Sequence, residues 1–278
     1  MPRLKLLSWN MAHSAGHWHK VLDSNVDVAL LQEAKAPPDD LKTKFNLDRE
    51  GNWYEPNLFW RAAVVGLVKS DQFEFEPIRT QPLGGSDPEA LMVSRPGSLA
   101  AAVVKINETG EEITIVSMYS TWMSPVRQTG SKWIFADASA HRLISDLCGL
   151  IGREKGHKII AAGDFNLLYG YGENGNLYWR GRYNTVFDRM KALGMRFVGP
   201  QAPEGGRQAD PWPLELPEDS LNVPTFYHSR QSPGTASRQL DFVFASESIA
   251  DRVTVKALNS AEEWGPSDHC RIMIELGV

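Results

Sequence analysis

The sequence of 278 residues has little cysteine, and Cys148 and Cys270 are its only residues of that type. Two cysteines are too few for the disulfide framework of a small secreted domain, and their spacing matches no metal-binding motif. We therefore expect two reduced, buried thiols. Long apolar runs are also missing, since no stretch approaches the roughly 18 residues needed to cross a bilayer, and the N-terminus lacks a signal-peptide pattern. These absences predict a cytoplasmic protein with no membrane association.

Positive charge is not in excess. The sequence has 29 Lys and Arg residues and 34 Asp and Glu residues, which give a net charge of −5. This balance argues against a protein that coats nucleic acid with a broad basic surface. It is compatible with an enzyme that binds phosphate locally through a metal ion and a few arginines. The sequence also lacks the Gly-rich phosphate loop of nucleotide-binding proteins and the Gly-x-Ser-x-Gly turn of serine hydrolases.

Hydrophobic residues make up 42% of the sequence and charged residues 23%, which is typical of a globular protein and excludes a disordered chain. A chain of this length buries enough surface to fold without a disulfide or a structural metal. Because the sequence has no internal repeat and no linker-like segment, we expect one domain, 1–278.

Short apolar runs rich in β-branched residues recur along the chain, each bounded by Gly, Pro, Asp or Asn. They predict nine strands, at Leu4–Trp9, Val26–Leu31, Ala62–Val68, Leu99–Ile106, Ile113–Tyr119, Lys158–Ala162, Leu240–Ala245, Val253–Leu258 and Cys270–Leu276. Apolar residues at three- and four-residue spacings predict helices at Ala15–Leu22, Ser131–Ile151 and Asn184–Leu193. Pro- and Gly-rich composition predicts irregular loops over 76–97 and 199–234. Strands at both ends of the chain favour an α+β sandwich over a doubly wound sheet.

Polar residues gather where the predicted strands begin or end. They are Asn10, Glu33, Asp164, Asn166, Asp241, Asp268 and His269. Taken singly, a polar residue at a strand end is more often a turn former or a solvated end than a ligand. Asp241 differs, because a carboxylate inside an apolar strand must be paired if it is buried.

The order of these segments is more specific than any one of them. Trp-Asn, Gln-Glu, Gly-Asp-Phe-Asn, Leu-Asp-Phe-Val and Ser-Asp-His follow one another along the chain. This series resembles the endonuclease/exonuclease/phosphatase superfamily, and the resemblance runs from Leu4 to Leu276. It implies a four-layer α/β sandwich, in which two mixed β-sheets pack face to face with helices outside.

The resemblance also implies a hydrolase of phosphoric esters that depends on Mg²⁺ or Mn²⁺. Glu33 matches the principal metal ligand of the family, and Asn10 and Asp268 are expected beside it. Oxygen donors with few nitrogens and no sulfur suit these hard cations, which keep several waters and bind substrate phosphate directly.

The remaining motif residues are matched to catalysis by the same resemblance. Asp164 corresponds to the carboxylate that activates or orients the attacking water, and Asn166 would orient the same centre. His269 would contact the scissile phosphate, and Asp241 would fix its tautomer and favour its protonated form. Family members differ on whether the histidine or the aspartate is the base, so both alternatives stay open.

Tyr119 ends a predicted strand and matches the abasic-endonuclease branch of the family, although Trp122 stands where that branch has Asn. We expect Tyr119 to contact the phosphate or the leaving oxygen. Aromatic rings and arginines follow the motif segments and suit a groove for unpaired nucleotides. The alternative is that these aromatic rings pack their loops against the body of the protein. The candidate substrate contacts are Trp122, Arg127, Trp179, Arg180 and Arg182.

Three histidines near the N-terminus, His13, His17 and His19, are too poorly spaced for a zinc site, because residues two apart on a helix do not share a face. We expect solvated side chains, with His13 near the rim of the cleft.

The sequence thus predicts a phosphodiesterase that cleaves nucleic acid by direct attack of water at phosphorus. The first alternative is a phosphatase or phosphodiesterase for a small phosphorylated metabolite or a lipid head group, although no segment has the pattern of a membrane-docking helix. The second is a non-catalytic binding module, which the intact Gly-Asp-Phe-Asn and Ser-Asp-His motifs disfavour. The sequence indicates no protein partner.

Overall fold

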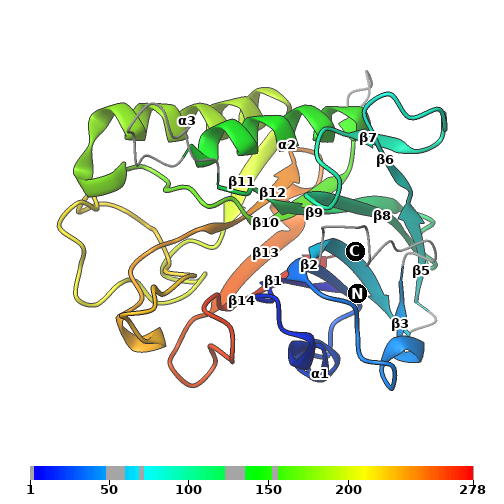
Figure 1. The fold of residues 1–278 in the computed structure, drawn as a ribbon, viewed down its shortest axis with the longest axis horizontal. Coiled ribbons are helices and arrows are strands. Elements are labelled where there is room, and N and C mark those ends of the chain that lie inside the picture. The colour runs from blue at the N-terminus through cyan, green and yellow to red at the C-terminus, as the bar shows by residue number, and fades with distance from the viewer. Residues whose placement is uncertain (1–2, 48–59, 69–71, 123–134, 152–155, 278) are drawn as a thin grey trace, which may run out of the picture.

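The computed structural model describes residues 3–47, 60–68, 72–122, 135–151 and 156–277. Two mixed β-sheets of six strands pack face to face (Figure 1). The first, in the order β13-β14-β1-β2-β4-β3, contains β1 (Arg3–Asn10), β2 (Val28–Ala34), β3 (Phe45–Asn46), β4 (Arg61–Leu67), β13 (Val253–Leu258) and β14 (Arg271–Gly277). The second, in the order β11-β12-β10-β9-β8-β5, contains β5 (Phe73–Ile78), β8 (Leu99–Ile106), β9 (Glu112–Tyr119), β10 (Ile159–Asp164), β11 (Met195–Gly199) and β12 (Asp241–Ser246).

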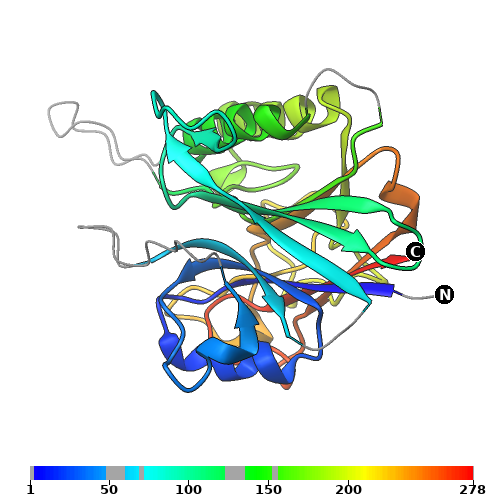
Figure 2. The same cartoon turned by 90° about the vertical axis from the view of Figure 1, so that its right-hand side faces the viewer.

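Helices form the two outer layers. α2 (Ala136–Ile151) and α3 (Leu177–Ala192) cover the outer face of the second sheet, and α1 (Trp18–Asp23) lies outside the first, as Figure 1 and Figure 2 show. A short parallel pair, β6 (Thr80–Pro82) and β7 (Leu91–Val93), packs beside α2. The arrangement confirms the predicted four-layer α/β sandwich.

Both faces of the sheets are apolar, because side chains alternate along a strand and each sheet has a layer on either side. In β1, Leu4 and Leu6 belong to the core between the sheets, whereas Leu7 and Trp9 pack with α1. Between the sheets, Gln32 also donates a hydrogen bond of 3.0 Å to the hydroxyl of Ser117. These packed layers hold the strand ends in fixed positions.

All nine predicted strands are present, with ends within three residues of those expected. The short strands β3, β5, β6, β7 and β11 were not predicted. The expectation of an irregular loop over 76–97 is wrong in part, because that segment contains β6, β7 and the end of β5. The segment 199–234 is irregular as predicted, apart from the last residue of β11, an isolated bridge at Phe226 and the start of a short 3-10 helix.

The third helix begins well before the predicted Asn184. α3 starts at Leu177, where the side chain of Asn176 accepts hydrogen bonds from the backbone N–H groups of Tyr178 and Trp179. This cap satisfies free donors of the first turn, and the buried aromatic rings of the early helix extend its apolar side. The second helix is described only from Ala136, so its predicted start at Ser131 lies outside the described residues.

Both cysteines are free. Cys270 is buried as expected, whereas Cys148 is only partly buried, because it lies near the solvent-facing side of α2. Within the described parts of the chain, no helix combines the length and the apolar character needed to span a membrane.

Candidate active site

The polar strand ends meet at one edge of the sandwich. β1 runs parallel to β2, and β9 runs parallel to β10, so that Asp164 lies level with Tyr119. Asp241 begins the antiparallel strand β12 opposite Asp164. Asn10 reaches from the first sheet, and its Nδ2 donates to Asp164 Oδ2 at 3.0 Å, although the two residues are 154 positions apart. Strand pairing therefore assembles the site from distant segments.

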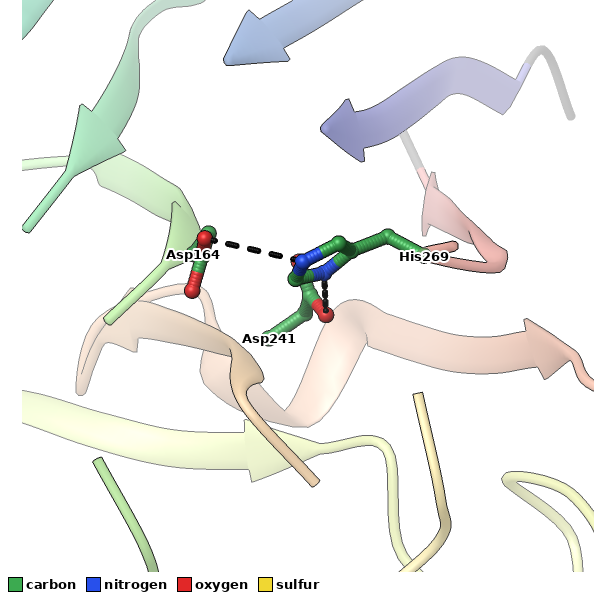
Figure 3. A group of neighbouring side chains, drawn as sticks. All are labelled: Asp164, Asp241 and His269. Carbon is green, nitrogen blue, oxygen red and sulfur yellow. Dashed lines mark hydrogen bonds and ion pairs between the residues drawn. The ribbon is translucent and has the colours of Figure 1, made fainter. Parts of the chain in front are cut away.

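A buried histidine lies between two buried carboxylates, as Figure 3 shows. His269 Nδ1 donates to Asp241 Oδ2 at 2.8 Å, and its Nε2 is 3.8 Å from Asp164 Oδ2. Burial by itself lowers the pKa of His269, but the charges of Asp241 and Asp164 outweigh it and raise that pKa to about 10. Burial also raises the pKa of Asp164, to about 7, against the opposing charge of His269. The ring therefore carries both protons at neutral pH and presents Nε2–H towards Asp164.

Hydrogen bonds from three directions fix the carboxylate of Asp164. Asn166 donates to it twice, from its backbone N–H at 2.8 Å and from its side-chain amide at 3.0 Å, in addition to the bond from Asn10. Gly163 permits the turn into this strand end, because its φ is +153° and a Cβ there would lie 1.9 Å from the carbonyl oxygen of Met118. The Gly-Asp-Phe-Asn motif thus has a conformational reason for its glycine and a hydrogen-bonding reason for its asparagine.

The loop that carries His269 is tied to the first sheet. Trp9 Nε1 donates to the carbonyl oxygen of His269 at 3.0 Å. The Ser267 hydroxyl donates to the carbonyl oxygen of Asn10 at 2.8 Å. The ring of Phe226 packs against the imidazole with 4.9 Å between ring centroids. Trp9, Ser267 and Phe226 were not among the predicted site residues. Trp9 and Ser267 adjoin predicted residues in the Trp-Asn and Ser-Asp-His motifs, whereas no sequence signal marks Phe226.

Glu33 is held by side chains from two other segments. Its Oε1 accepts a hydrogen bond from the Tyr119 hydroxyl at 2.6 Å, and its Oε2 pairs with His13 Nε2 at 2.8 Å. Burial and the nearby charge of Glu33 raise the pKa of Tyr119 far above its ordinary value, so the phenol stays protonated and remains a donor. Tyr119 therefore orients Glu33 in this structure.

The three predicted metal ligands all offer oxygen atoms. Glu33 offers a carboxylate that is 16% exposed, Asn10 offers an amide oxygen, and Asp268 offers a partly buried carboxylate that accepts a long bond of 3.4 Å from Ser267. Such oxygen ligands suit Mg²⁺ and Mn²⁺.

A second group of ligand atoms comes from Asp164, Asp241 and His269, which lie within 4.8 Å of one another. That spacing could also accommodate a metal ion. Because His269 Nδ1 bonds to Asp241, and Asp164 accepts bonds from Asn10 and Asn166, we interpret this group as a hydrogen-bonded network. Among the described residues no other group of three His, Cys, Asp or Glu ligand atoms is this compact, so the assignment of the metal to Glu33, Asn10 and Asp268 stays a prediction.

The structure separates the predicted substrate contacts into two groups. Trp122 is 57% exposed and donates from Nε1 to the side-chain oxygen of Asn166, and Arg180 is exposed on α3. Trp179 lies in α3 and is only 3% exposed, because it packs into the apolar cluster on the outer face of the second sheet; Arg182, also in α3, pairs with buried Asp137 at 2.6 Å. In this structure Trp179 has a packing role and Arg182 a pairing role, and their contact with substrate stays a prediction. The predicted contact Arg127 lies outside the described residues.

A cavity of about 470 Å³ opens beside Phe226 and Arg238. Phe226, whose ring packs on His269, forms part of its wall, and Arg238, paired with Glu173 at 3.0 Å, forms another part. The remaining lining residues are Glu215, His228, Gln231 and Ser237. Most of this wall comes from the irregular segment 199–234, so the Pro-rich loop shapes the space beside the site.

Solved structures share this architecture at low sequence identity. The AP endonuclease LMAP from Leishmania major is 16% identical, with a TM-score of 0.63 over 99% of this chain and 88% of that one. An AP endonuclease from Archaeoglobus fulgidus is 16% identical, with a TM-score of 0.57 over 99% and 100%. The endonuclease domain of TRAS1, a telomere-specific non-LTR retrotransposon, is 16% identical, with a TM-score of 0.59 over 99% and 98%. These similarities show the fold.

No curated protein matches the chain. The model of the endonuclease/exonuclease/phosphatase family, in contrast, matches residues 7–269 and so spans every motif from Trp9 to His269. The same residues converge in space at the edge of the two sheets. The chain therefore belongs to the endonuclease/exonuclease/phosphatase family of hydrolases.

Proposed function

We propose that this protein is a Mg²⁺- or Mn²⁺-dependent phosphodiesterase that cleaves nucleic acid by direct attack of water at phosphorus. Support comes above all from the placement of His269 between Asp241 and Asp164, where a buried, charged donor faces a rigid buried carboxylate. Family membership supports phosphoric ester hydrolysis. The structural neighbours named above, all described as endonucleases, favour nucleic acid as the substrate.

Hydrolysis of a phosphodiester needs an oriented water and counter-charge for the phosphoryl oxygens. We assign the orientation of the water to Asp164, whose acceptor oxygens are held in place by Asn10 and Asn166. His269 donates from Nε2 to a phosphoryl oxygen, and Asp241 holds the ring so that this nitrogen faces the substrate. His269 Nε2 and Asp164 Oδ2 are 3.8 Å apart, close enough for both groups to act on the same phosphate.

The metal ion belongs at Glu33, with Asn10 and Asp268 as further oxygen donors. When bound, it supplies positive charge to the phosphoryl and leaving oxygens. Tyr119 binds Glu33 Oε1, so Oε2, which lies 2.8 Å from His13 Nε2, would be the oxygen that holds the cation. In this proposal Tyr119 positions the metal ligand, and the phosphate contact expected from the sequence is assigned to His269.

A second candidate function is hydrolysis of a small phosphorylated metabolite. It is favoured by the cavity of about 470 Å³ beside Phe226, the residue whose ring packs on His269, because this volume lies in the size range of small-molecule sites. The net charge of −5 also suits a small substrate better than a long polyanion.

A substrate panel tests the two candidates. The purified protein is incubated with labelled single- and double-stranded DNA, RNA and small phosphate mono- and diesters, with Mg²⁺ or Mn²⁺ and with a chelator. We expect metal-dependent cleavage of nucleic acid. Hydrolysis restricted to the small esters would replace our proposal with the second candidate.

Asp164→Asn is the matching active-site variant, since it keeps the shape of the side chain but removes its charge. We expect its turnover to fall by about 10²–10⁴-fold. Arg196→Ala is the control, because Arg196 pairs with Asp251 and lies level with Ala245, at the end of β12 remote from Asp241. Full activity in Asp164→Asn would exclude Asp164 from the mechanism.

A further inference from the structure

His13 is placed against Glu33 by two contacts. Its Nε2 lies 2.8 Å from Glu33 Oε2, and its backbone N–H donates to the Glu33 carbonyl oxygen at 3.2 Å. Since the Tyr119 hydroxyl occupies Oε1, the imidazole faces the oxygen that is left for a cation. The pairing links the loop after β1 to the end of β2.

The backbone around this pair adopts conformations that most side chains avoid. Ala12, His13 and Glu33 have φ values of +44°, +59° and +49°, all in the left-handed region. The ring of Trp60 packs against both His13 and Tyr119, with centroid separations of 5.6 Å and 4.9 Å. His13 is thus oriented by its surroundings, while its side chain remains 44% exposed and open to an ion from solvent.

We propose that His13 is a further ligand of the divalent cation held by Glu33, through its Nε2 atom. The spacing fits, because two ligand atoms about 2.1 Å from one ion and at right angles to each other lie about 3 Å apart. The Nε2 to Oε2 distance of 2.8 Å is close to that value. This inference rests on the proposed function, since it requires Glu33 to hold the metal.

A nitrogen ligand changes which cation the site prefers. Imidazole binds later first-row metals better than it binds Mg²⁺, whereas carboxylates suit Mg²⁺ and Mn²⁺ alike. The site therefore discriminates in favour of Mn²⁺ over Mg²⁺, and His13 is the residue that makes the difference.

Pulsed electron paramagnetic resonance on the Mn²⁺-loaded full chain tests the inference without an activity assay. A coordinated imidazole produces a ¹⁴N coupling to Mn²⁺, which we expect in the wild-type protein. His13→Gly should abolish it, and glycine tolerates the φ of +59° at this position. His17→Ala is the matched control, because His17 is a nearby histidine stacked on Trp9, and this variant should retain the coupling.

Calorimetric titration with Mn²⁺ and Mg²⁺ completes the test. We expect His13→Gly to bind Mn²⁺ at least about tenfold more weakly and to lose less affinity for Mg²⁺. Absence of the ¹⁴N coupling in the wild type, its persistence in His13→Gly, or tighter Mn²⁺ binding by that variant would overturn the inference. Glu33→Gln distinguishes failure of the His13 inference from failure of the proposed metal site. If this variant binds Mn²⁺ like the wild type, the proposed metal site itself is wrong.

Discussion

The substitution Asp241→Asn removes the charge that holds His269 without changing the volume of the side chain. In the native protein both groups are buried, with relative exposures of 2% for Asp241 and 5% for His269, and their atoms are 2.8 Å apart. Removing one partner of a buried ion pair costs about 3–5 kcal/mol. Here the imidazole can respond by losing its proton, and an amide facing Nδ1 also disturbs the tautomer.

If the transition state loses this stabilisation, the activation free energy rises by the same amount. The rate then decreases by about 10²–10⁴-fold, because about 1.4 kcal/mol corresponds to a factor of ten. Single-turnover cleavage of the best substrate from the panel measures this rate directly. Thermal unfolding, followed in parallel, shows whether the variant remains folded.

Asp146→Asn is the matched control, since Asp146 is also buried and accepts hydrogen bonds from Ser94, but it lies in α2 on the outer face of the second sheet. We expect this variant to keep its single-turnover rate. A folded Asp241→Asn protein that reacts within tenfold of the wild type would refute the role assigned to the Asp241–His269 pair.

Three further predictions concern the metal, the aromatic residues and pH. Glu33→Gln should remove the metal dependence of any residual cleavage, and a titration curve like that of the wild type would contradict its role as ligand. Trp179→Ala should lower the free energy of unfolding by about 3–5 kcal/mol because its ring is buried, whereas Trp122→Ala should weaken substrate binding with little change in stability; denaturant unfolding and KM distinguish the two. Ion pairing with Arg252 holds the pKa of Glu111 at about 2, below its ordinary 4.5, so this pair stabilises the fold above about pH 4.5 and the contribution is lost as the pH falls through 2. Because Arg252 is partly exposed, we expect Glu111→Gln to lower the free energy of unfolding by about 1–2 kcal/mol at neutral pH. A difference in this free energy between variant and wild type that stays constant on acidification would contradict the stabilising role of the pair.

Most strands of this fold can be predicted from the sequence, because each buries apolar side chains and is bounded by turn-forming residues. Within the predicted strand Lys158–Ala162, the residues Ile159–Ala162 are continuously apolar, as a strand covered on both faces requires, and they lie in β10. The short strand β3 has only two residues, so no local pattern distinguishes it from a loop. The predicted strands have six to eight residues, and the missed ones have five or fewer, except β5, which has six.

The two tryptophans after the motif segments show where such reasoning fails. Trp122 and Trp179 have similar neighbours in sequence, with arginines close by. Trp122 is nevertheless 57% exposed beside Asn166, whereas Trp179, in α3, is 3% exposed in the apolar cluster on the second sheet. Burial depends on which element packs above a residue, and a local window holds no information about that.

The sequence by itself determined the strand-rich sandwich and the set of chemically competent residues, because side-chain alternation and residue type are local properties. Only the tertiary structure decided how these residues act on one another. Tyr119 reaches Glu33 across 86 positions, and Asn10 reaches Asp164 across 154, through the pairing of strands and the packing of two sheets. The charge of His269 follows from that same packing, since it depends on two carboxylates brought close in a place from which water is excluded.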